Sequence, residues 1–143
     1  MILVDANLPL YAYDRSSPRY QEARQWFESA LNGPEPVRFA WVTLLAFLRI
    51  ATNPRAFARP LSFGEAMTIV EGWLGLPLTG ILEPTERHLE LLRATAVSGQ
   101  ARGPLLTDAH LATLAIEHGA TLCTTDRDFG RFSGLRFTNP LPA

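Results

Sequence analysis

The segment Thr107–Phe129, which reads TDAHLATLAIEHGATLCTTDRDF, decides the fold that we expect for this chain. Behind Asp108, apolar residues recur at helical spacing, and the glycine that follows stands where a left-handed helix stop is expected. The next residues have the length and apolar character of a short buried strand, and Asp126 and Asp128 follow it directly. One carboxylate therefore lies at a helix start and two at a strand end. In a parallel sheet both positions face the carboxyl ends of the strands.

The rest of the chain repeats this alternation of strand and helix. Met1–Val4 is an apolar strand that ends in Asp5, and a short helix around Pro9 follows it. Further strands are predicted at Val37–Trp41, Thr79–Leu82, Thr121–Thr125 and Leu135–Thr138, and further helices at Pro18–Leu31, Thr43–Thr52, Ser62–Gly75 and Thr85–Gly99. The pattern predicts an α/β fold of one domain, residues 1–143, in which helices flank a central parallel sheet.

The composition is that of an ordinary globular domain, with 47% hydrophobic residues and a mean hydropathy of +0.04. No apolar run approaches the roughly 20 residues of a membrane span, and we expect no signal peptide because Met1 leads straight into a strand. Cys123 is the only cysteine, so no internal disulfide can form. These features favour a reducing, cytoplasmic location.

The charged residues narrow the chemistry. The net charge of −1 gives no overall attraction for a polyanion, but all 13 basic residues are arginines. Two explanations for the use of arginine in place of lysine are open. One is GC-rich coding, and the other is contact with phosphate, which a guanidinium group binds through two parallel hydrogen bonds. A Walker-type nucleotide site needs a lysine, as do receiver domains and haloacid-dehalogenase-like phosphatases, so these classes are excluded. Arg49 and Arg102 are the arginines that we expect nearest the site, as contacts to phosphate.

Four of the five aspartates fall at expected carboxyl ends of strands: Asp5, Asp108, Asp126 and Asp128. Each alone is a common cap or turn residue. Together they would raise one another's pKa unless a cation lay among them, and hard oxygen ligands suit Mg²⁺ or Mn²⁺. Asn7 and Thr124 could orient a carboxylate or a water there, or make only local hydrogen bonds.

The histidines offer no alternative metal site by their spacing. His88, His110 and His118 stand in no ligand pattern with one another or with Cys123. His118 lies near a helix end, where the helix dipole favours it. We expect structural or surface roles for all three.

The whole chain resembles PIN-domain proteins of the VapC toxin family, on four stretches: MILVDAN, FLRIATNP, TDAHLATLAIEHGATLCTTDRDFGRF and LRFTNPL. The resemblance implies an Mg²⁺- or Mn²⁺-dependent endoribonuclease of a toxin–antitoxin pair, a homodimer, and a cognate VapB-type antitoxin that covers the site. It matches Asp5, Asp108 and Asp126 to metal-site acids and Thr124 to a small hydroxyl residue. Asp128 could replace or assist Asp126.

One departure from the family leaves a second hypothesis open. Many relatives carry glutamate where this chain has Ala46. The first hypothesis is a metal-dependent ribonuclease that hydrolyses RNA phosphodiesters with a metal-activated water. The second is a catalytically weakened module that binds RNA or antitoxin, which Ala46 favours and the four retained aspartates disfavour.

Overall fold

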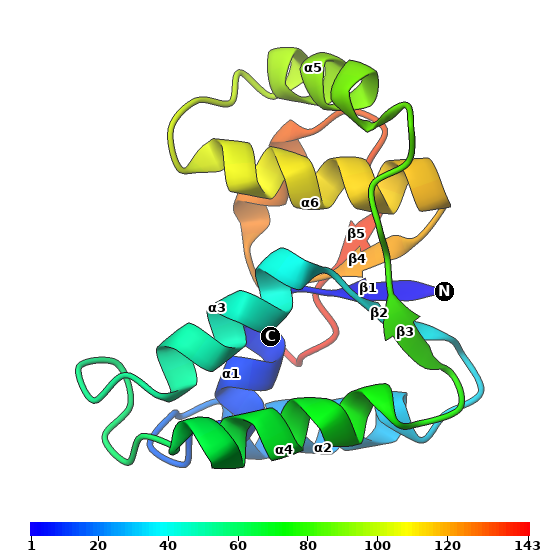
Figure 1. Ribbon diagram of the computed structural model, residues 1–143. Helices are drawn as coiled ribbons and strands as arrows, with labels where there is room; N and C mark the ends of the chain where they lie inside the picture. The colour runs from blue at the N-terminus through cyan, green and yellow to red at the C-terminus, as the bar shows by residue number, and fades with distance from the viewer.

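The computed structural model describes residues 1–143 (Figure 1). Its five strands are β1 (Ile2–Val4), β2 (Val37–Phe39), β3 (Thr79–Ile81), β4 (Thr121–Cys123) and β5 (Phe137–Thr138). Its helices are α1 (Asn7–Tyr13), α2 (Tyr20–Leu31), α3 (Trp41–Ala51), α4 (Phe63–Leu74), α5 (His88–Ser98) and α6 (Leu105–His118), with a short 3₁₀ helix η1 (Arg127–Arg131). All five predicted strands are present, each one or two residues shorter at one end than predicted.

The strands form one parallel sheet in the order β3-β2-β1-β4-β5. The chain builds outward from β1 to β3 on one side and then returns to place β4 and β5 on the other. The strand order therefore reverses between β1 and β4. At such a reversal the two following connections diverge, which opens the carboxyl edge of the sheet to ligands. The predicted α/β architecture is confirmed, and its reversal point lies where Asp5 and Thr124 follow their strands.

The two faces of the sheet carry separate hydrophobic cores. Successive strand residues point to opposite faces, so Leu3 and Leu122 pack under α6 while Val4 and Cys123 pack on the other side. Helices α1, α2, α3 and α4 cover that second side, and α5 lies outside α6 (Figure 1). Apolar side chains fill the space on both faces of the sheet. The polar side chains of interest therefore lie beyond the carboxyl ends of the strands.

The helix ends show where local sequence signals held. Gly119 ends α6 in the left-handed conformation, with φ of 67°, as predicted. Ser62 and Glu65 form the predicted capping box of α4. By contrast, α6 begins at Leu105 rather than at Asp108, because Pro104 already has helical dihedrals and acts as the N-cap residue. Asp108 consequently lies in the first turn of α6 and not at its cap.

Two other helices begin later than predicted. Helix α2 starts at Tyr20 instead of Pro18, because Ser17 is held in a turn by a bond from its N–H to the Asp14 carbonyl. Helix α5 starts at His88 instead of Thr85, and the Thr85 hydroxyl donates to Glu117. In both cases the expected capping hydroxyl holds a turn before the helix, because Ser17 Oγ accepts from the Arg19 N–H and Thr85 Oγ1 from the Arg87 N–H.

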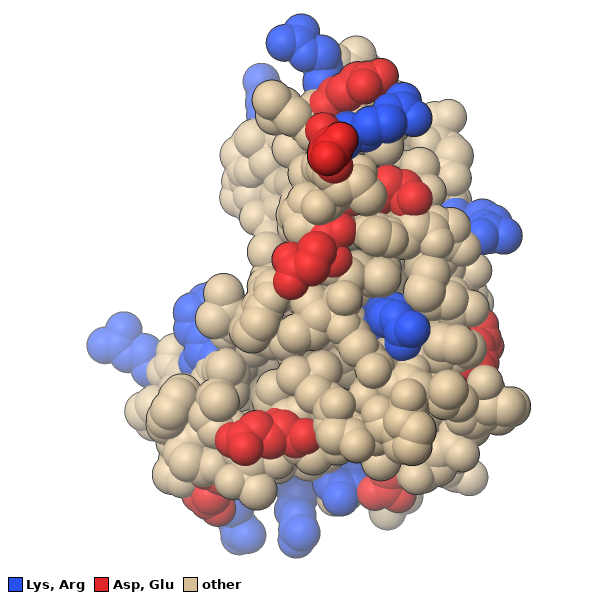
Figure 2. Space-filling model, turned by 45° about the vertical axis from the view of Figure 1, so that its right-hand side comes forward, with Lys and Arg blue, Asp and Glu red and all other residues tan.

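The surface carries no broad field of one charge on the face shown in Figure 2, where acidic and basic side chains are interspersed over a mostly uncharged area. This agrees with the net charge of −1. No helix is long and apolar enough to cross a membrane.

Candidate active site

Thr124 joins the polar groups at the reversal point. It follows β4 directly, and its side chain is 1% exposed. Its hydroxyl donates to Asp5 Oδ2 at 2.8 Å and accepts from Asn7 Nδ2 at 3.3 Å and from the Asp126 N–H at 3.0 Å. One buried hydroxyl therefore fixes residues that follow β1 and β4, which are neighbouring strands from opposite ends of the chain.

Asp5 is held rigidly by this network. Its Oδ1 accepts from the Ala6 N–H at 2.8 Å, while Oδ2 takes the Thr124 hydroxyl. Burial raises the pKa of Asp5, and the charge of Asp126 adds to the rise, although the two hydrogen bonds oppose it. Asp5 is therefore a preoriented carboxylate that lacks a compensating positive charge.

Asp108 approaches the same place from α6. Its pKa is raised to about 6, first by partial burial and then by the charges of Asp5, Asp126 and Asp128, in that order. The charges of the other three predicted aspartates therefore all act on Asp108. Asp126 acts on Asp108 more strongly than Asp128 does, and its Oδ1 also accepts from the Asp128 N–H at 2.9 Å, which caps η1.

These side chains are not drawn together into a closed metal cage: no three His, Cys, Asp or Glu residues are grouped closely enough to hold an ion among them. The donor set nevertheless fits a hydrated hard cation, which keeps several waters and needs only one or two carboxylates besides the substrate phosphate. The buried Asn7 Oδ1 supports this fit, because it has no hydrogen-bond partner while its amide nitrogen is bonded to Thr124.

One arginine whose charge acts on the site was missed by sequence reasoning. Arg131, at the end of η1, lowers the pKa of Asp108 by its charge and donates to the Gly99 carbonyl at 3.1 Å. Arg49 and Arg102, the predicted RNA contacts, are exposed and form no ion pair, and neither affects the pKa of Asp5 or Asp108. The sequence feature that could have indicated Arg131 is its position two residues after Asp128-Phe129, on the same short helix as Asp128.

The sequence of this chain is similar to those of known proteins along nearly its whole length. The model of the PIN domain family matches residues 2–135. Ribonuclease VapC37 of Mycobacterium tuberculosis is 43% identical over 140 residues, which cover 98% of this chain and 97% of that protein. The chain belongs to the VapC family of PIN-domain proteins. Ribonuclease VapC33 from the same species is 36% identical over 99% of both chains.

Solved VapC-type structures share the fold at low sequence identity. A VapBC2 complex of Rickettsia felis, bound to a DNA fragment from its promoter, superposes with a TM-score of 0.70 at 15% identity over 97% of this chain and 98% of that one. VapC20 of Mycobacterium tuberculosis, described as a toxin that cleaves the sarcin–ricin loop, gives 0.67 at 16% identity over 95% of this chain and 99% of that one. At these identities the likeness shows the fold alone.

Ala46, where the family resemblance led us to expect a glutamate, lies on a defined face of α3. Leu44, Phe47 and Ala51 pack into the core on the α1 side of the sheet. Val42 packs instead against the core beneath α6. Ala46 is one helical turn after Val42 and therefore shares the face that looks toward α6. A glutamate there would point to the side from which Asp108 comes.

The histidines are arranged differently from what the sequence spacing indicated. His88 Nε2 and His110 Nδ1 are hydrogen-bonded at 2.8 Å, and His88 Nδ1 is paired with Glu117 Oε1 at 2.8 Å. The Glu117 side chain is only 2% exposed, so this chain of contacts lies largely between α5 and α6. Burial lowers the pKa of His110. The expected structural role fits, but the pairing of two histidines 22 residues apart was not foreseen.

Proposed function

We propose that this VapC-family protein is a metal-dependent endoribonuclease, the toxin of a toxin–antitoxin pair. The observation that carries the proposal is that the Thr124 hydroxyl bonds both the Asp5 carboxylate and the Asp126 N–H, while the charges of Asp5 and Asp126 act on Asp108, in a chain 43% identical to Ribonuclease VapC37. The alternative of a weakened binding module rests on Ala46 alone, and the named relatives give it no support.

The site residues divide the work of phosphodiester hydrolysis. Asp5 and Asp108 would hold Mg²⁺ or Mn²⁺ directly, and Asp126 would join them directly or through bound water. When bound, such a cation lowers the pKa of its water and neutralises charge on the phosphodiester. Thr124 keeps Asp5 in one orientation through its 2.8 Å bond. Asp128 caps η1 and adds negative charge near Asp108, so we assign it a supporting role.

Positive charge for the RNA comes from arginines around these acids. Arg131 is the first candidate, because its charge already acts on Asp108. Arg49, in the last turn of α3, and Arg102, in the loop before α6, have free guanidinium groups that can reach phosphate from further out. RNA affinity should therefore fall as the salt concentration rises.

The protein partner in this proposal is a VapB-type antitoxin. Several VapC-type neighbours were solved as toxin–antitoxin complexes, among them that of Rickettsia felis and one from Salmonella typhimurium. We further propose a homodimer, as the family resemblance implies. A cytoplasmic location follows from an RNA substrate.

The experiment is cleavage of a generic single-stranded RNA with Mn²⁺ by the parent protein and by Asp108→Asn. The substitution keeps the size of the side chain but removes its charge. We expect a loss of activity of about a hundredfold or more, the scale seen when one electrostatic contact to a transition state is removed. Glu71→Gln, an exposed acid on α4, is the matched control and should cleave like the parent. Equal cleavage by Asp108→Asn would refute the proposal.

A further inference from the structure

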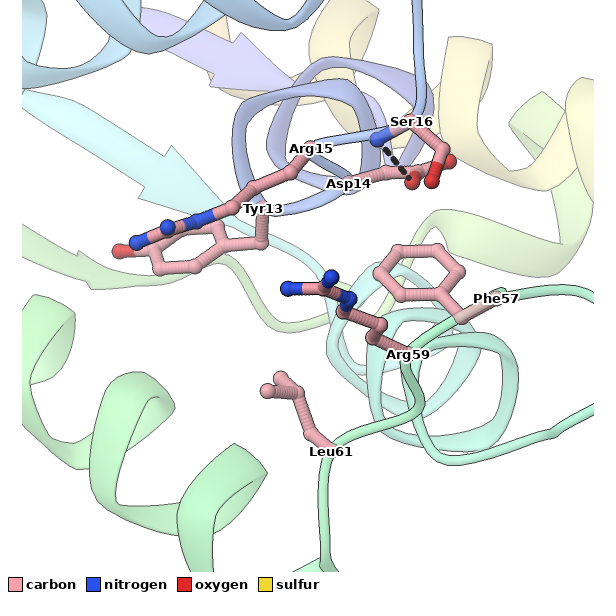
Figure 3. A pocket seen from close by; sticks show the side chains of 7 residues that line it. All are labelled: Tyr13, Asp14, Arg15, Ser16, Phe57, Arg59 and Leu61. Atoms are coloured by element: carbon pink, nitrogen blue, oxygen red, sulfur yellow. Dashed lines mark hydrogen bonds between the residues drawn. The ribbon is translucent and has the colours of Figure 1, made fainter.

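A cavity of about 480 Å³ lies between the end of α1 and the connection that joins α3 to α4 (Figure 3). It is lined by Tyr13, Asp14 and Arg15 on one side and by Phe57 and Arg59 on the other. The four aspartates of the candidate active site do not line it. Its volume falls in the range of pockets that take small organic ligands.

Two arginine side chains that line this cavity have no partner in the protein. Neither Arg15 nor Arg59 forms an ion pair or a side-chain hydrogen bond. In Figure 3 the Arg59 side chain extends from the connection toward the end of α1, which carries Arg15. Two arginines that line one cavity and have all their donors free are suited to a phosphate, which each can bind through two parallel bonds.

The walls of the cavity are held in place by the fold. The Tyr13 hydroxyl accepts from Trp73 Nε1 at 3.1 Å, and the Tyr13 ring packs edge-on against Phe47. The connection is pinned where the Leu61 N–H donates to the Ala51 carbonyl at 2.9 Å. Phe57 is 5% exposed and forms part of the floor. The cavity is therefore a built feature of the fold and not a gap between loose loops.

Helix α1 connects this cavity with the candidate active site. Helix α1 begins at Asn7, beside Thr124, and ends at Tyr13, which lines the cavity. Seven residues of helix span about 10 Å. The cavity thus lies about one helix length from the residues beside Thr124, which a single RNA strand bound at the aspartates can span within a few nucleotides.

Asp14 supplies a hydrogen-bond acceptor beside the two arginines. Its Oδ1 accepts from the Ser16 N–H at 3.0 Å, and the carboxylate lines the same cavity as the arginines. A ribonucleotide offers both a phosphate for the guanidinium groups and hydroxyl donors for Asp14.

We infer that this cavity is a nucleotide subsite, in which Arg15 and Arg59 bind a phosphate of the RNA strand at a distance from the scissile bond. The inference rests on the proposed ribonuclease function. In this inference the cavity binds one nucleotide of the RNA strand while a different phosphodiester of the same strand is cleaved at the aspartates.

The test measures binding of a fluorescent single-stranded 12-nucleotide RNA in the Asp108→Asn background, where cleavage does not interfere. The double variant Arg15→Ala/Arg59→Ala should lose roughly tenfold or more in affinity, and its salt dependence should be shallower by about 0.7 in the log–log slope for one lost phosphate contact. Arg55→Ala is the matched control, because this arginine lies exposed on the same connection but does not line the cavity. It should stay within about twofold of the background protein. Circular dichroism melts confirm that the variants fold.

Three outcomes would overturn the subsite. One is unchanged RNA affinity in the double variant, and another is an equal loss in Arg55→Ala, which would mean unspecific attraction. The third is an oligoglutamate peptide that binds through Arg15 and Arg59 while RNA binding does not depend on them. If the subsite fails but Asp108→Asn still abolishes cleavage, the proposed function stands. A parent protein that neither binds nor cleaves RNA would overturn both.

Discussion

At the scale of single residues, the Thr124 hydroxyl carries the most contacts of any side chain in the site. It donates a hydrogen bond to Asp5 and accepts one each from the Asn7 amide and the Asp126 N–H. Thr124→Val keeps the shape but leaves the Asn7 amide and the Asp126 N–H without this acceptor. We expect the free energy of unfolding to fall by about 1 to 3 kcal/mol, as measured by urea denaturation.

Thr124→Ser provides the control for that prediction because it keeps the hydroxyl and removes only a methyl group. Its RNA cleavage should stay near that of the parent, whereas Thr124→Val should lose activity in proportion to the misorientation of Asp5. If Val and Ser variants cleaved RNA equally well, the hydroxyl would have no positioning role.

The carboxyl of Asp108 predicts how stability depends on pH. Its pKa of about 6 in the folded protein exceeds the value of 3.8 for an unperturbed group, so the folded state holds the proton more tightly. The stabilisation is therefore complete below about pH 4 and is lost as the pH rises through 6. Because Asp108 is partly exposed and screened, we expect a loss of only about 1 to 2 kcal/mol between pH 4 and pH 7 without divalent metal.

Asp108→Asn should flatten that dependence, since an amide does not titrate over this range. Some slope will remain, because the pKa of Asp5 is raised in the same direction. Chemical denaturation at several pH values in the presence of a chelator measures both curves. A parent protein that became more stable from pH 4 to pH 7 relative to Asp108→Asn would contradict the raised pKa.

At the scale of secondary-structure elements, α3 presents its two faces to two different cores, and Ala46 lies on the face toward α6. Ala46→Glu should place a further carboxylate beside Asp108, bind Mn²⁺ more tightly and raise RNA cleavage. Helix propensities of the two residues are similar, so the cost without metal should be modest and come from repulsion among acids. Cleavage assays and metal titration of both proteins test this.

The outcomes for Ala46→Glu separate the two hypotheses for this chain. An active parent that gains nothing from the glutamate would mean that Asp128 or a water already serves in its place. A parent that is inert, and that stays inert with the glutamate, would favour the binding module. Ala46→Gln is the control, because it matches the size of glutamate without the charge.

At the scale of the whole molecule, a shared cation would join the two ends of the chain. Asp5 follows the first strand and Asp108 belongs to the last long helix, yet their charges act on each other. Binding to the folded state alone raises stability by mass action. Mn²⁺ or Mg²⁺ should therefore raise the melting temperature at neutral pH, as followed by differential scanning fluorimetry.

Asp108→Asn should abolish most of this rise in melting temperature. The melting temperature without metal is measured in Ca²⁺-free buffer that contains a chelator. Because the same substitution removes repulsion, the variant should melt at or above the parent when no metal is present. A variant that lacks both Asp5 and Asp108 but still gains stability from Mn²⁺ would place the ion elsewhere.

The sequence by itself determined the features that depend on neighbours along the chain. Alternation of apolar strands with amphipathic helices required a parallel sheet, since each crossover must carry a helix. It also placed Asp5 and Asp126 at carboxyl ends of strands and put the left-handed stop at Gly119. These properties follow from side-chain periodicity and backbone sterics, which are local.

Only the tertiary structure decided which distant side chains meet. Sequence order indicated Arg49 and Arg102 as the basic partners of the acids, whereas η1 carries Arg131 to Asp108. The contact of His88 with His110 and the pairing of Arg15 with Arg59 around one cavity depend in the same way on how helices and connections pack. Residue spacing sets the direction of a side chain on its own element, but the packing of one element on another sets what it faces, because that packing is fixed by the two cores as a whole.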